Sequence, residues 1–327
     1  MPSLAQRRWG PTRLLWLAAF GAGYLLVLPS RPVFASRERR AVAALLGAAF
    51  LFGATFVVVK SALDAIEPLA FVAWRFSIGA LLLSTLAIPK GRALWIHGLF
   101  AGTALFAGYS LQTLGLELTG AANSALITGL YVVFTPFLAA FFSRRPPSPW
   151  VVGGAVTAFA GVAMLTGGDG LALDRGDLLT VGCALAFAAH IVLLARYAPR
   201  HPVVPFTTVQ LAVTAVLAIV GSWVFEGGPG VPDRSVWAAI AVTAIGVTVG
   251  AYLLQIWSQT VLGAATAAIV LSAEPAFGVA TSWVVLGERL SLQGWIGAGL
   301  IVAAIYVVVT RQRDGASREA EAVSPAH

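Results

Sequence analysis

The residues that could do chemistry are few, because most of this sequence is apolar and its charges fall mainly between long hydrophobic runs. Glu274, Arg75 and His190 are the exceptions, since each lies well inside such a run. An ionisable side chain is unfavourable inside an apolar helix in a membrane and usually has a function there. We therefore expect these three residues to mark a binding or coupling site.

Glu274 lies near the middle of the hydrophobic run 261–286, with Pro275 directly after it. Proline cannot donate a backbone hydrogen bond, so the helix is expected to break there and free backbone carbonyl groups. A carboxyl group withdrawn from water keeps its proton more readily and could exchange it near neutral pH. The alternative role is structural, in which Glu274 only satisfies backbone groups at the proline kink.

Arg75 and His190 also have two alternative roles each. The guanidinium of Arg75 could bind a substrate carboxylate in a bidentate manner, or it could be a structural partner for Glu274 or for a free carbonyl. His190 titrates in the useful pH range, but a lone histidine among helices can also act as a simple hydrogen-bonding residue. The sequence leaves these readings open.

The other candidates are polar or aromatic. Tyr131 aligns with Glu274 in the internal repeat described below, so the two could face each other across a site. Lys60, near the end of run 41–63, is expected to extend its ammonium group to the membrane interface. The remaining candidates could bind substrate, gate a path or link helices: Tyr109, Gln112, Tyr252, Gln255 and Trp74.

Composition places these residues in a membrane protein. Hydrophobic residues make up 58% of the chain and charged residues 11%, against roughly 25% charged in a typical soluble domain. The single Cys183 excludes a disulfide framework and gives no metal signature, and we expect neither a metal nor a cofactor. The net charge of +7 comes from arginines in short loops, which indicates membrane topology and not a nucleic-acid-binding face.

We predict an all-α polytopic membrane protein with ten transmembrane helices. A spanning helix needs about 20 apolar residues, and runs of that order recur along the chain. The joint at 259–268 is the least polar of the boundaries. The predicted spans are 41–63, 69–88, 94–116, 119–142, 150–166, 177–198, 205–225, 236–257, 261–286 and 292–310.

Loop charges set the predicted orientation. With a cytoplasmic start, the inside segments hold most of the lysines and arginines, whereas the outside loops hold only Arg175, Arg234 and Arg289. Because positively charged loops stay in the cytoplasm, both termini are predicted inside. The expected location is the inner (plasma) membrane of a bacterial-type cell.

The predicted domains follow from these spans. Residues 41–168 and 177–310 form two five-helix repeats, and the polar segment 311–327 is expected to be a disordered cytoplasmic tail. Residues 1–40 form an N-terminal extension with an apolar segment at 14–28 that resembles a signal-peptide core. Cleavage after Ala35 would place Arg37 outside, against the charge pattern, so we expect a short interfacial extension instead.

An internal repeat relates the two halves. A shift of 143 residues aligns 109–166 with 252–309, with a Tyr-x-Leu-Gln block in both, and a shift of 135 aligns 47–59 with 182–194 and Phe71 with Phe206. Each half has five predicted spans, an odd number, so the halves must be inverted in the membrane. Inverted halves that rock against each other expose a central site alternately to each side, which indicates a secondary transporter.

Three stretches resemble the EamA-type branch of the drug/metabolite transporter superfamily: 124–136 (SALITGLYVVFTP), Glu274-Pro275-x-Phe277 and 287–291 (GERLS). The resemblance covers about 41–310. It implies ten spans in two five-helix repeats and export of amino acids or other small metabolites, driven by protons or another gradient. In the first half, 143–146 (SRRP) replaces the Gly-Glu-Arg that often follows the fourth span.

Other classes of protein fit less well. Nucleophile-elbow and His-Glu-x-x-His motifs are absent from the spans, so no enzyme is predicted. A membrane scaffold remains possible by composition, but it has no evident use for inverted halves. A multidrug or cation exporter would need an acidic site that Arg75 does not balance. The substrate is therefore predicted to be a small molecule, zwitterionic if Arg75 and Glu274 share one cavity, with protons as a possible partner and the oligomeric state not predicted.

Overall fold

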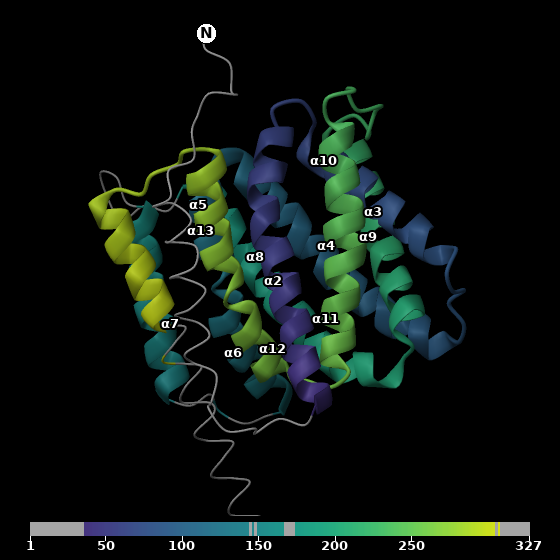
Figure 1. Ribbon diagram of the computed structural model, residues 1–327, viewed down its shortest axis with the longest axis horizontal. Helices are drawn as coiled ribbons and strands as arrows, with labels where there is room; N and C mark the ends of the chain where they lie inside the picture. Colours follow the sequence, from purple (N-terminus) through teal and green to yellow (C-terminus); the bar gives the residue numbers. More distant parts are fainter. Residues whose placement is uncertain (1–35, 144–145, 147–148, 167–173, 305–306, 308–327) are drawn as a thin grey trace, which may run out of the picture.

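The computed structural model describes residues 36–143, 146, 149–166, 174–304 and 307, and within these ranges it contains helices and no β-strand (Figure 1). The predicted extension before residue 36 and the predicted tail after residue 310 lie outside the described residues. The first half comprises α2 (Ser36–Ala62), α3 (Pro68–Ser84), α4 (Arg92–Leu118), α5 (Ala121–Thr128), α6 (Tyr131–Ser143) and α7 (Pro149–Thr166).

The second half has a matching order of elements. It comprises α8 (Arg175–Tyr197), the short 3₁₀ turn η2 (Ala198–Arg200), α9 (Val203–Phe225), α10 (Trp237–Val242), the π-helix η3 (Thr243–Ala251), α11 (Tyr252–Gln259), α12 (Ala264–Leu271) and α13 (Glu274–Val285). A shorter apolar helix at Leu292–Ala304 follows.

The all-helical membrane class predicted from composition is confirmed. Six helical stretches in the described part of the chain are long and apolar enough to cross a membrane, and α3 and the helix at Leu292–Ala304 are shorter apolar helices. Helical residues occupy each predicted span, although α3 ends at Ser84 and not at residue 88. The six stretches are Arg37–Ala62, Arg92–Leu118, Ala121–Phe142, Arg175–Arg200, Val203–Phe225 and Trp237–Gln259.

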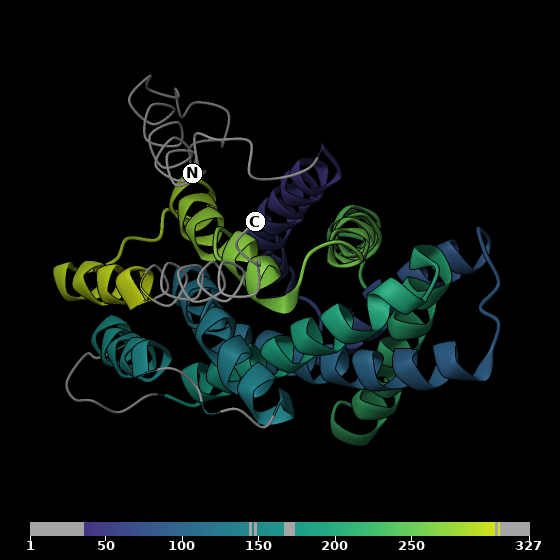
Figure 2. The ribbon, with the colours of Figure 1, turned by 90° about the horizontal axis from the view of Figure 1, so that it is seen from below.

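Most of the longer helices stand side by side, and segments far apart in sequence are neighbours. α2 lies beside η3 and α11 of the other half, α3 packs on α9, and α4 packs on α8 (Figure 1). Seen from below, α7 and the helix at Leu292–Ala304 lie at the same side of the bundle, and Gly161 of α7 approaches the backbone of Gly297 (Figure 2). The two halves of the sequence therefore interleave instead of forming separate bodies.

The end of α4 is fixed by a lysine from α2. Lys60 Nζ donates hydrogen bonds to the carbonyl oxygens of Leu116 at 2.8 Å, Glu117 at 3.1 Å and Thr119 at 2.9 Å. The last carbonyls of a helix lack internal partners and carry partial negative charge, so an ammonium group stabilises them. The structure thus gives Lys60 a helix-capping contact, and the extension of its ammonium group to the membrane interface stays a prediction.

Candidate functional site

Two helices are interrupted at equivalent positions of the repeat. Residues 129–130 separate α5 from α6, and residues 272–273, which lie 143 positions later, separate α12 from α13. The first interruption contacts the start of α13, directly after the second, because a methyl group at Gly129 would lie 2.4 Å from Pro275 Cγ. Interrupted helices at matching places in two halves are typical of binding sites in transporters built from repeats.

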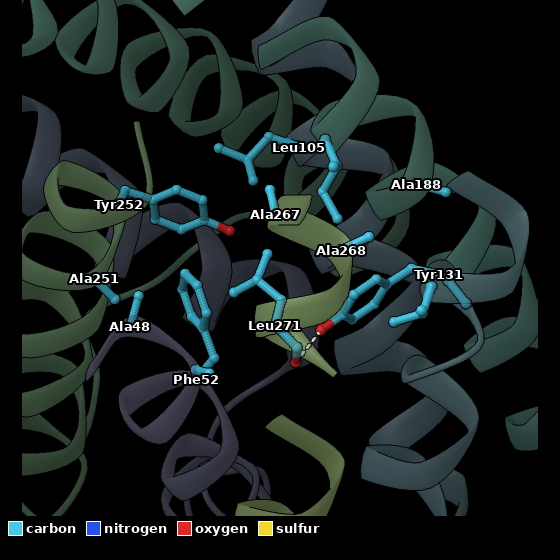
Figure 3. Packing of buried hydrophobic residues seen from close by; sticks show 14 of the residues in the cluster. Ala48, Phe52, Leu105, Tyr131, Ala188, Ala251, Tyr252, Ala267, Ala268 and Leu271 are labelled. Atoms are coloured by element: carbon cyan, nitrogen blue, oxygen red, sulfur yellow. Dashed lines mark hydrogen bonds between the residues drawn. The ribbon is translucent and has the colours of Figure 1, made fainter. Parts of the chain in front are cut away.

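Tyr131 satisfies the carbonyl group that Pro275 leaves without a partner. The carbonyl of Leu271 would accept a helical hydrogen bond from residue 275, but proline has no N–H. The hydroxyl of Tyr131 donates to this oxygen at 2.6 Å (Figure 3) and lies 3.2 Å from Glu274 Oε2. Tyr131 and Glu274 are thus in contact, as their alignment predicts, and each is the first residue after a break.

A small cavity of about 30 Å³ lies beside Glu274. Since one water needs roughly 10–15 Å³, the cavity can hold water but no metabolite in this conformation. It is lined by aromatic and polar side chains from both halves of the chain, with Phe52 and Tyr252 facing Leu271 in Figure 3. The lining residues are Phe52, Thr55, Tyr109, Gln112, Tyr131, Phe187, His190, Ile191, Tyr252, Gln255, Leu271 and Glu274.

A second pair of equivalent residues, Tyr109 and Tyr252, meets in the cavity wall. The Tyr252 hydroxyl donates to the Tyr109 hydroxyl at 3.1 Å. Behind Tyr109, Arg75 is 2% exposed and donates from Nε to Thr248 Oγ1 at 2.6 Å and from a terminal nitrogen to the Tyr109 hydroxyl at 3.4 Å. Its guanidinium carbon lies 4.6 Å from the centre of the Tyr109 ring.

Arg75 therefore does not line the cavity, and within the described chain it forms no ion pair with Glu274. The structure thus answers the question that the sequence left open, which was whether these two charges share one cavity. Thr248, which accepts the hydrogen bond from Arg75, lies in the π-helix η3. The equivalent residues of the first half, 100–108, are ordinary α-helix within α4.

Gln210 is a site residue that sequence reasoning missed. It is fully buried on α9, its amide nitrogen donates to Phe206 O at 3.1 Å, and its amide oxygen lies 2.9 Å from His190 Nε2. Because that oxygen can only accept, Nε2 of His190 carries a proton and Nδ1 remains an acceptor. The 135-residue shift aligns Gln210 with Arg75, so the repeat contained the signal that could have identified it.

The two equivalent glutamines tie the cavity wall to neighbouring helices. Gln112 Nε2 lies 3.5 Å from Thr128 Oγ1, at the end of α5. Gln255 Nε2 donates to Gln259 Oε1 at 3.2 Å, and Gln259 in turn donates to Ile191 O at 3.0 Å. Both glutamines line the cavity. Gln112 also bonds to another helix, whereas Gln255 bonds within α11 to Gln259, which reaches α8. Their roles in binding or gating stay predictions.

Trp74 lies apart from the cavity. Its indole nitrogen donates to the backbone oxygens of Pro229 at 3.2 Å and Gly230 at 3.1 Å, and its ring packs edge-on against Trp237 at 5.2 Å. It therefore joins α3 to the loop after α9. No group of three potential metal ligands occurs among the residues that the structure describes.

A histidine pair lies away from the cavity, near the start of α4. His97 Nδ1 and His201 Nε2 are 2.7 Å apart, and the His97 ring stacks on Tyr197 at 3.9 Å. Burial, the neighbouring His97 and the positive charge of Arg200 lower the pKa of His201, so its neutral form is favoured at neutral pH. This pair joins α4 to the η2 turn and has no contact with the cavity lining.

A family model described as the EamA-like transporter family matches two stretches of the chain, residues 39–167 and 174–310. The chain belongs to the EamA-like transporter family. This membership confirms the resemblance inferred from the sequence motifs. The family implies a protein embedded in a membrane with a small molecule as its substrate.

Individual relatives support the assignment of this chain to the EamA-like transporter family. An uncharacterized transporter of Archaeoglobus fulgidus is 34% identical over 269 residues, covering 80% of this chain and 83% of the relative. A protein of Ancylobacter novellus named an aromatic amino acid exporter is 27% identical over 226 residues, covering 63% and 76%. A solved crystal structure with a TM-score of 0.61 and 24% identity covers 83% of this chain and 98% of its own, and shows the same fold.

Proposed function

We propose that this EamA-like protein is a secondary active transporter that works by alternating access, with ten spans in two inverted halves. The observation that carries the proposal is that equivalent residues of the two halves bond to each other. Tyr109 bonds to Tyr252 and Tyr131 to Glu274, and both pairs are 143 residues apart. Two positions related by a two-fold axis can touch only near that axis, so both pairs mark one axis through the cavity.

Helix packing supports the same axis. α3 packs on its equivalent α9, and α7 approaches its equivalent at Leu292–Ala304. The contact of α5 with α13 has its counterpart in the contact of α12 with α6. The contact of α4 with α8 has its counterpart in the contact of α11 with α2. With an odd number of spans in each half, such an axis lies in the membrane plane and makes the halves inverted.

We further propose export of amino acids or other small metabolites, with proton coupling at Glu274. The carboxyl group of Glu274 is the acidic group of the cavity, and its surroundings include the rings of Phe52, Tyr109 and Phe187. The relative named as an aromatic amino acid exporter is consistent with such a lining. Export of cations is the second candidate, and the absence of Arg75 from the cavity wall favours it.

Uptake into inside-out membrane vesicles tests the proposed function. We expect a panel of radiolabelled amino acids to include members that accumulate when the vesicle lumen is acidic, and that stop accumulating when an ionophore removes the proton gradient. Absence of gradient-dependent uptake for the whole panel would contradict the proposal. Undiminished uptake by both Glu274→Gln and Arg75→Ala would contradict the assigned roles.

Two carboxylates tie the halves together at the proposed outer face. Glu226, which follows α9, accepts the backbone N–H groups of Leu69 at 2.7 Å and Ala70 at 2.9 Å at the start of α3. Glu288, in the loop after α13, accepts those of Ala121 at 3.1 Å and Ala122 at 2.9 Å at the start of α5. A carboxylate stabilises a helix N-terminus, and because each contact joins the two halves, we propose that both ties favour a closed outer end.

Replacing these two carboxylates by neutral amides is expected to make the outer end of the protein open more often. In a Cys183→Ala background carrying Thr55→Cys in the cavity wall, the double change Glu226→Gln and Glu288→Gln should speed labelling by an impermeant maleimide added outside. Because each tie contributes about 1–3 kcal/mol, we expect an increase of roughly tenfold or more. Glu117→Gln, at an exposed carboxylate of the same face, is the control, and equal labelling rates in all variants would contradict the role of the ties.

A further inference from the structure

We propose that the cavity recognises its substrate by a protonated amine and does not require a carboxylate on the substrate. The substrate class would then include aromatic monoamines as well as aromatic amino acids. This inference rests on the proposed transport function and names the chemical group that the same cavity selects. It follows from the charges, the rings and the hydrogen bonds of the cavity wall.

The charges of the wall are unbalanced. Among the lining residues that the structure describes, Glu274 is the one carboxylic acid and none is a lysine or arginine. Glu274 is 7% exposed, so water screens its charge only weakly. A buried carboxylate without a cationic partner is unfavourable, and a bound ammonium group would supply that partner.

Arg75 reaches this wall through its contact with Tyr109, but its guanidinium is engaged in other bonds. Its guanidinium is held by Thr248 Oγ1 and the Tyr109 hydroxyl, and it stacks on the Tyr109 ring. To pair with a substrate in the cavity it would have to break these hydrogen bonds. A carboxylate entering the cavity would therefore lie beside the carboxyl group of Glu274 without a cation from the described lining to pair with.

The rings of the wall favour a cation. Phe52, Tyr109, Phe187 and Tyr252 line the cavity, and Phe52 packs against Tyr252 with ring centres 5.1 Å apart. Aromatic faces carry partial negative charge and attract ammonium groups within about 6 Å. The same rings give an aromatic substrate apolar surface to pack on. The wall thus suits a molecule that joins an aromatic ring to an amine.

The hydrogen bonds of the wall lead to the same conclusion. The Tyr131 hydroxyl donates to Leu271 O, the Tyr252 hydroxyl donates to Tyr109, and His190 Nε2 donates to Gln210. These three donors are engaged inside the protein, whereas the carboxylate of Glu274 and Nδ1 of His190 are acceptors that suit an ammonium group. The Tyr109 hydroxyl and the amides of Gln112 and Gln255, which also line the cavity, can donate as well as accept. An ammonium group has three N–H donors and no acceptor, so it complements such a wall.

Three probes with the same phenyl ring distinguish the contribution of the amine to binding from that of the carboxylate. They are 2-phenylethylamine, which has only the amine, phenylalanine, which has both groups, and 3-phenylpropionate, which has only the carboxylate. Binding is measured by thermal stabilisation of the purified full-length protein, and movement by uptake into proteoliposomes with an acidic lumen. We expect the amine and phenylalanine to stabilise the protein, to compete with each other and to be taken up, and 3-phenylpropionate to do none of these.

Variants assign the effect to Glu274. Glu274→Gln is expected to weaken binding of 2-phenylethylamine by roughly tenfold or more, because it removes a charge-assisted hydrogen bond. Glu117→Gln makes the same chemical change at an exposed position and should leave binding unchanged. If Glu274→Gln does not fold, as judged by size-exclusion chromatography, the order of the three probes on the unaltered protein still decides the question.

Binding of phenylalanine without binding of 2-phenylethylamine would overturn the inference, as would equal binding of 3-phenylpropionate or no binding of any probe. Failure of the transport proposal gives a different result. In that case 2-phenylethylamine binds and depends on Glu274, but no probe accumulates in proteoliposomes under any proton gradient. That result supports amine recognition and contradicts coupled transport.

Discussion

Replacing Glu274 by glutamine is expected to reduce gradient-driven uptake to the level of vesicles without the protein. The amide has nearly the same shape, so the Tyr131 hydroxyl can keep its hydrogen bond to Leu271 O and the helix break stays satisfied. The amide cannot release or bind a proton near neutral pH and cannot hold a negative charge. A transporter coupled at this residue therefore loses its driving force while its fold is retained.

Uptake against a concentration gradient in proteoliposomes is the deciding measurement. Glu117→Gln provides the matched control, since it removes one carboxylate at an exposed position outside the cavity. Size-exclusion chromatography of both variants shows whether the fold is intact. Accumulation by Glu274→Gln at the rate of the unaltered protein would exclude Glu274 as the coupling residue.

Adding one methyl group at Gly53 is expected to destabilise the protein markedly. The new Cβ of Gly53→Ala would lie 2.6 Å from the carbonyl oxygen of Glu274 and 2.9 Å from the backbone nitrogen of Gly278. Both are backbone atoms, so α2 and α13 must move apart. Such overpacking costs about 1–3 kcal/mol of unfolding free energy, and the shift would also displace Glu274.

Gly153→Ala is the matched control, because the same methyl group on α7 meets no atom within 4 Å. Alanine favours a helix over glycine by about 1 kcal/mol, so this variant should be neutral or slightly more stable. The stability of both variants is measured as the midpoint temperature of unfolding, at which half of the monodisperse peak in size-exclusion chromatography is lost. Equal midpoints for the two variants would mean that α2 and α13 are not in the close contact described.

The sequence predicted the class of the protein and the location of its helices, because the length of an apolar run and the charges that bound it follow directly from residue order. It also predicted the helix break at Pro275, since a missing N–H is a property of the residue itself. The contact between Tyr131 and Glu274 agrees with their alignment in the internal repeat, which can be seen in the residue order.

Only the tertiary structure placed Arg75 behind Tyr109, directed Trp74 to the loop after α9, and brought Gln210 onto His190. These outcomes depend on how far each helix is rotated about its own axis. α3 and α9 are apolar on nearly every side, so their sequences contain no stripe that shows which face turns inward. The packing of both halves against each other fixes that rotation, and with it the residues that line the cavity.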